Sequence, residues 1–101
     1  MRILFLVFRN PGPSWVPGVS TREQPLWDEH AEFMDKLFEE RHIVLAGPYA
    51  DYSRALVIVQ ASDSESAAAL FQDDPWTKAG ILLRGEVVEW NVFLDSTRLS
   101  E

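Results

Sequence analysis

The sequence has 101 residues, of which 47% are hydrophobic and 25% are charged, and it carries a formal net charge of −7. This length predicts a single domain over residues 1–101, and the hydrophobic fraction is above that of disordered chains. The acidic charge argues against nucleic-acid binding, because no cluster of lysines and arginines is present to neutralise phosphates.

Neither a membrane span nor a secretory signal is expected. The longest apolar run, residues 3–8, is far shorter than the roughly 20 residues that cross a bilayer, and no small-residue cleavage site follows it. We therefore predict a cytoplasmic protein with no membrane partner. The chain has no cysteine, and its two histidines and scattered carboxylates lack metal-ligand spacing, so neither a metal nor a cofactor is predicted.

The N-terminal quarter predicts a strand followed by a long loop. Residues 2–9 form a continuous apolar run with branched and aromatic side chains, which is typical of a strand buried on both faces. Residues 10–25 contain four of the six prolines and favour neither a helix nor a sheet. Loops of this length are often functional.

An amphipathic helix is predicted to begin near Pro25, because proline suits the first helical turn. Beyond it, apolar side chains recur at intervals of three and four, with acidic side chains between them. His30 falls on the apolar stripe and is therefore expected to point inward. The other members of the stripe are Leu26, Trp27, Phe33, Met34, Leu37 and Phe38.

The middle of the chain predicts a hairpin and a second helix. Residues 43–46 and 55–61 are short β-branched runs that would pair across residues 51–54. Ser62 and Glu65 have the spacing of a capping box in front of an apolar segment, which predicts a helix start.

The C-terminal part predicts a one-turn helix and a last strand. Asp74 suits an N-cap with Pro75 in the first helical position, and Gly80 would end this helix. The last strand lies within residues 81–93, where Gly85 marks a bulge or bend.

The predicted order is β-α-β-β-α-β, an α+β ferredoxin-like fold with a four-stranded antiparallel sheet and both helices on one face. The first and third strands are apolar at consecutive positions, so the second face of the sheet also requires cover. A second copy of the chain is the simplest cover, which predicts a homodimer. In the alternative, residues 10–25 with Trp15 fold over that face of a monomer.

His30 and Asp74 are the candidate catalytic residues. An inward imidazole is either a core group bonded to a backbone carbonyl or a general acid or base. A carboxylate that caps a helix could also fix the tautomer of such a histidine and support its charged form. By contrast, His42 follows the end of the predicted helix, where a positive charge interacts favourably with the free carbonyl groups.

The tryptophans are candidates for substrate binding. Trp27 and Trp76 flank His30 and Asp74 in the sequence, so they could form the walls of a pocket. Trp15, in the long loop, is the third candidate.

These segments together resemble the YCII (YciI-like) family of small dimeric α+β barrel proteins. The resemblance rests on HAEFMDKL from residue 30, LAGP from residue 45, Asp51, and DPWTKAG from residue 74. It implies a dimeric barrel and an active-site pair of His30 and Asp74. The family is similar in fold to muconolactone isomerase-like proteins and cofactor-free monooxygenases, and a few members take part in dehydrochlorination of aromatic-degradation intermediates.

Two features depart from the family pattern: Arg41-His42 stands where a glycine usually closes the helix, and the loop at residues 10–25 is longer and richer in proline.

From the candidate pair and the resemblance we expect a small cofactor-independent enzyme of lyase or isomerase type, which transfers a proton on a small organic molecule. His30 would move the proton and Asp74 would orient it. The alternative is a non-catalytic small-molecule-binding or accessory dimeric module.

Overall fold

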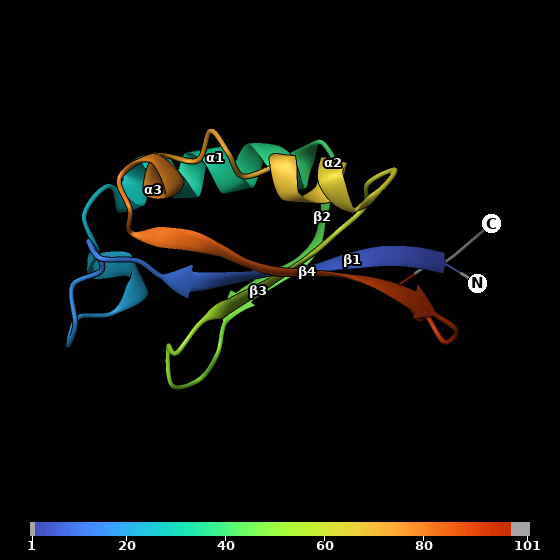
Figure 1. Ribbon diagram of the computed structural model, residues 1–101, viewed down its shortest axis with the longest axis horizontal. Coiled ribbons are helices and arrows are strands. Elements are labelled where there is room, and N and C mark those ends of the chain that lie inside the picture. The colour runs from blue at the N-terminus through green and yellow to red at the C-terminus, as the bar shows by residue number, and fades with distance from the viewer. Residues whose placement is uncertain (1, 98–101) are drawn as a thin grey trace.

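The computed structural model describes residues 2–97, so Met1 and residues 98–101 of the predicted domain lie outside the described residues. The predicted α+β ferredoxin-like fold is confirmed, with the three α-helices on one side of the sheet (Figure 1). In chain order the elements are β1 (Arg2–Pro11), the 3-10 helix η1 (Thr21–Glu23), α1 (Trp27–Glu39), β2 (Ile43–Pro48), β3 (Ala55–Val59), α2 (Ser64–Ala69), α3 (Pro75–Lys78) and β4 (Leu82–Val92).

The sheet is antiparallel with the strand order β2-β3-β1-β4, which places β3 and β1 at the centre. The hairpin predicted between β2 and β3 is present, with its turn at residues 49–54. No helix within residues 2–97 has the length and apolar character needed to span a bilayer.

The bulge predicted at Gly85 is also present. Between the pair Val7–Val87 and the pair Arg9–Arg84, two residues of β4 lie opposite one residue of β1. A Cβ added to Gly85 would come within 3.0 Å of a backbone oxygen of β1, so the close approach of the two strands requires glycine at this point.

Alternation along β1 separates the two faces of the sheet. Phe5, Val7 and Arg9 are buried on the side of the helices. The apolar core on that side contains Phe5, Val7, Ile43, Val57, Val59, Ala67 and Phe71. On the outer face, four apolar side chains of the edge strands β2 and β4 are at least 40% exposed in the single chain. They are Leu45, Leu83, Val88 and Trp90.

The first long helix begins later than predicted. α1 starts at Trp27 and not near Pro25, because Leu26 adopts the left-handed conformation with φ 59°. The carbonyl oxygen of Pro25 accepts a hydrogen bond of 2.7 Å from Nε1 of Trp76. Pro25 therefore belongs to the connection that joins the long loop to α1.

The capping residue of α2 also differs from the prediction. The side chain of Asp63, and not that of Ser62, accepts a hydrogen bond of 2.7 Å from the backbone N–H of Ser66. Aspartate and serine have nearly equal N-cap preference, so the choice between neighbours depends on which residue takes the extended conformation, and here that residue is Asp63.

The end of α1 forms a Schellman motif without glycine. The N–H of Arg41 donates to the carbonyl of Phe38, and the N–H of His42 donates to that of Leu37, at 3.0 and 2.9 Å. This geometry requires a left-handed residue after the helix, and Arg41 takes that position with φ 66°.

Candidate functional site

His30 and Asp74 meet in the structure. His30 lies in the first turn of α1 and Asp74 is the N-cap of α3. The Nδ1 atom of the imidazole lies 2.9 and 3.0 Å from the two carboxylate oxygens, with side chains 9% and 0% exposed. Because an ionised carboxylate only accepts hydrogen bonds, the neutral form of the ring in this contact carries its proton on Nδ1 and has its lone pair on Nε2.

Two further groups hold the carboxylate of Asp74. Its Oδ1 atom accepts a hydrogen bond of 3.0 Å from the backbone N–H of Trp76, the N-cap interaction predicted from the sequence. Its Oδ2 atom lies 3.6 Å from Nη1 of Arg9. Both contacts hold the carboxylate in place beside the imidazole.

Arg9 is the buried cation of the site, and the sequence analysis did not single it out. It is 2% exposed, and its Nη2 atom donates to Oγ1 of Thr77 at 2.5 Å. Its Nε and Nη1 atoms make no hydrogen bond to any of the described residues 2–97. Burial lowers the pKa of the Arg9 guanidinium, while the carboxylate of Asp74 acts in the opposite direction. Arg9 points inward because alternate residues of a strand face the same side, and it follows Phe5 and Val7 in that alternation.

The predicted tryptophans gather around the imidazole. The rings of His30 and Trp76 are stacked, with centroids 3.8 Å apart and planes at 4°. Trp27 lies 5.8 Å from both rings, and Trp15 packs edge-on against Trp76 at 6.0 Å. These contacts fix the plane of the imidazole.

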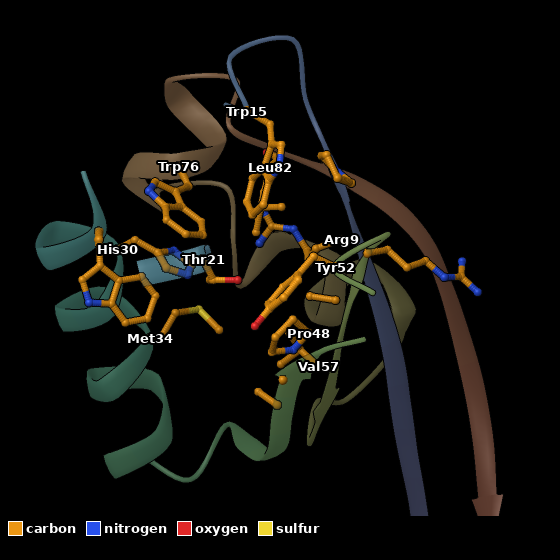
Figure 2. Close-up of a pocket in the computed structure, with 16 residues that line it drawn as sticks. Arg9, Trp15, Thr21, His30, Met34, Pro48, Tyr52, Val57, Trp76 and Leu82 are labelled. Carbon is orange, nitrogen blue, oxygen red and sulfur yellow. The ribbon is translucent and has the colours of Figure 1, made fainter. Parts of the chain in front are cut away.

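A cavity of about 230 Å³ opens beside this group, between α1 and the end of the sheet where β1 and β2 finish (Figure 2). Its lining is mostly apolar. It includes His30 and all three predicted tryptophans, together with Pro11, Met34, Pro48, Val57 and Leu82. The geometry therefore offers a ring nitrogen as a base on the wall of an aromatic pocket.

The long loop forms part of this cavity. Gln24 is 3% exposed, and its side-chain amide bonds both the N–H and the carbonyl of Val16, each at 2.8 Å. This clamp holds Trp15 against Trp76. The loop thus packs at the cavity and leaves apolar side chains of the outer sheet face exposed, which contradicts the alternative in which it covers that face.

Two more wall residues come from connections that sequence patterns do not place. Thr21 lines the cavity from η1, and Tyr52 lines it from the hairpin between β2 and β3. Both positions depend on how loops fold against each other. His42 lies at the opposite end of α1 from His30 and does not line the cavity. Within residues 2–97, no three side chains of metal-binding type gather.

Comparisons with known proteins agree with this architecture. The family model for the YCII-related domain matches residues 1–91. The uncharacterized protein YjpA of Bacillus subtilis (strain 168) is 31% identical over 51 residues, which are 50% of this chain and 60% of that protein. The alignment thus covers less than two thirds of that relative.

A solved structure shares the fold. It is 5-chloro-2-hydroxyhydroquinone dehydrochlorinase (TftG) from Burkholderia phenoliruptrix AC1100, in complex with 2,5-dihydroxybenzoquinone. It matches 93% of this chain and 97% of its own with a TM-score of 0.54 and 22% sequence identity.

Proposed function

The chain belongs to the family of YCII-related domains, and from this premise we propose that it is a small cofactor-independent enzyme that transfers a proton, of lyase or isomerase type. One observation carries the proposal. The Nδ1 atom of His30 lies 2.9 Å from a fully buried carboxylate of Asp74, on the wall of a mostly apolar cavity.

In the proposed reaction, Nε2 of His30 removes a proton from the substrate. Asp74 holds the ring in the required tautomer and stabilises the imidazolium that forms. Arg9 and the N–H of Trp76 keep the carboxylate in position. The aromatic walls exclude water, which strengthens these electrostatic interactions.

We propose a planar oxygenated ring as the substrate class. The flat walls formed by Trp15, Trp27 and Trp76 suit a ring that stacks or packs edge-on. The substrate in the name of the structural neighbour, 5-chloro-2-hydroxyhydroquinone, belongs to this class.

Kinetics with chlorinated hydroxyhydroquinones test this proposal. The variant His30→Gln should lower kcat by about 10²–10⁴-fold and leave binding largely intact, because general-base catalysis contributes on this order. His42→Gln, which changes the other histidine, is the matched control and should keep full activity. If the wild type binds these compounds and turns none of them over, the protein is a binding or accessory module.

We also propose that two copies pair through the outer face of the sheet as an α+β barrel. Trp90 and Val88 of β4 are 42% and 40% exposed on this face in the single chain, and monomers rarely expose large apolar patches. Sedimentation equilibrium should give twice the chain mass of 11.5 kDa, and Trp90→Asp should shift the protein toward the monomer. A wild-type monomer at micromolar concentration would contradict the pairing.

A further inference from the structure

Two hydroxyl groups of the cavity wall are not used by the proposed catalytic pair. Figure 2 shows the side-chain oxygens of Thr21 and Tyr52 directed into the cavity. The oxygen of Thr21 is buried and makes no hydrogen bond to any other group in the described part of the chain. A buried hydroxyl without a partner is unfavourable, so a ligand oxygen that reaches Thr21 would supply its missing hydrogen bond.

The other polar groups around Thr21 are already paired. The side chain of Ser20 donates to Glu23 at 2.8 Å, and the backbone carbonyl of Thr21 accepts from the N–H of Gln24 at 3.2 Å. Gln24 in turn clamps Val16. Thr21 is therefore held in place by a bonded loop while its own hydroxyl stays unpaired.

Tyr52 is held in a strained backbone conformation. Its φ is 58°, a left-handed value that non-glycine residues rarely adopt. The turn around it is bonded, because the N–H of Tyr52 donates to the carbonyl of Tyr49 and the side chain of Asp51 accepts from the N–H of Ser53, each at 2.9 Å. Such strain concentrates at functional sites, where the surrounding structure imposes it.

Each arginine of the cavity lining faces an acidic side chain. Arg9 faces Asp74, and Arg54 lies over the ring of Phe8 at 4.1 Å and 3.6 Å from Glu86. The lining also offers the two hydroxyls and the imidazole of His30 to a polar group of a ligand.

We propose that Thr21 and Tyr52 form an oxygen-binding subsite that determines specificity. They bind one oxygen of the ring substrate, a carbonyl, enol or phenol oxygen, while another group of the same ring faces Nε2 of His30. The subsite rests on the proposed use of this cavity for ligand binding, and it selects rings that carry at least two polar positions. A ring with one such position would leave either the subsite or His30 without a partner.

Calorimetric titration with hydroquinone and phenol tests the subsite, because these rings differ by one oxygen. The wild type should prefer hydroquinone by on the order of tenfold, as expected for one additional hydrogen bond. Tyr52→Phe removes a single oxygen and keeps the ring of the wall, and combined with Thr21→Val it should bring the preference close to one. Tyr49→Phe, at the other tyrosine of the chain, is the matched control and should leave the preference unchanged, and Thr21→Ser should retain it.

Thermal unfolding of the free protein provides a second measurement. Thr21→Val should unfold at the same or a higher Tm than the wild type, because it replaces an unpaired buried hydroxyl with a methyl group. A clear fall in Tm would mean that the hydroxyl has a structural partner, and would overturn the subsite.

The outcomes separate the two proposals. If the double variant keeps the hydroquinone preference while His30→Gln still abolishes turnover, the subsite is wrong and the proposed function stands. If the wild type binds both rings equally, the subsite is wrong as well. If the wild type binds neither ring, both the subsite and the proposed substrate class are overturned.

Discussion

The two ends of the interface between the helices and the sheet are filled in opposite ways. At one end, Phe5 and Val7 of β1 are 2% and 0% exposed in an apolar core. At the other end, the next inward residue of the same strand is Arg9, which faces Asp74, the partner of His30, beside a cavity. Burial of apolar area stabilises the first end, whereas burial of charge in the second is costly. The second end therefore serves the binding of a ligand and not the stability of the fold, as the proposed function requires.

The largest effect should come from separating the buried charges. Asp74→Ala removes the carboxylate beside Arg9 and the N-cap of α3, and should lower the free energy of unfolding by about 3–5 kcal/mol. Adding Arg9→Met should recover part of this loss, since no unpaired charge then remains. Urea unfolding of the single and double variants measures the coupling. Strictly additive losses would mean that the two charges do not interact.

At the apolar end, a truncation should cost less and act independently. Val59→Ala removes a side chain that is 0% exposed in the core and should lower the free energy of unfolding by about 2 kcal/mol. Because Val59 belongs to the apolar core and Asp74 to the charged group beside the cavity, its effect should add to that of Asp74→Ala. A coupling above about 0.5 kcal/mol in the same urea titrations would show that the two ends are not separate.

A change outside both ends should stabilise the fold. Arg41→Gly relieves the left-handed conformation at the end of α1 and should raise the free energy of unfolding by up to about 1 kcal/mol. Arg41→Ala removes the same side chain but keeps a Cβ in that conformation. It should therefore give no gain, and equal gains from both variants would assign the effect to the arginine side chain.

The smallest effect is expected at the peripheral pair of Arg2 and Asp95, whose side chains are 15% and 14% exposed. Hydrogen bonds from Thr97 and Arg2 lower the pKa of Asp95 to about 2. A carboxyl with a depressed pKa stabilises the fold above its ordinary value of 3.8, and this contribution fades as the pH falls toward 2. The difference in urea midpoint between wild type and Asp95→Asn should therefore shrink from pH 5 to pH 2.5. A constant difference would contradict the assigned pKa.

The fold and the individual placement of His30 and Asp74 can be predicted from the sequence, because both depend on local signals. Helical spacing directs His30 inward, and the Asp74-Pro75 pair predicts the N-cap that fixes the carboxylate. Alternation along a single strand likewise separates the two faces of the sheet. The meeting of His30 with Asp74 was implied by the resemblance and not by the spacing, because the two residues are far apart in the chain.

The rest of the cavity depends on tertiary contacts. Arg9 ends an apolar run, and the pattern of that run does not mark it as a site residue, although alternation from Val7 directs it inward. Thr21 and Tyr52 reach the cavity only because the clamp at Gln24 and a left-handed turn position their loops. Such contacts leave no periodic pattern in the sequence.

Nitrogen-15 NMR of the His30 ring tests most directly whether Asp74 holds the imidazole with Nε2 free toward the cavity. The chain has two histidines, so His42→Gln leaves His30 as the only source of imidazole nitrogen signals. Under conditions where the ring is neutral, the wild type should show a protonated Nδ1 and an unprotonated Nε2, and Asp74→Asn should disturb that pattern. A protonated Nε2 in the wild type, or a pattern unchanged by Asp74→Asn, would contradict the His30–Asp74 pair as the catalytic base.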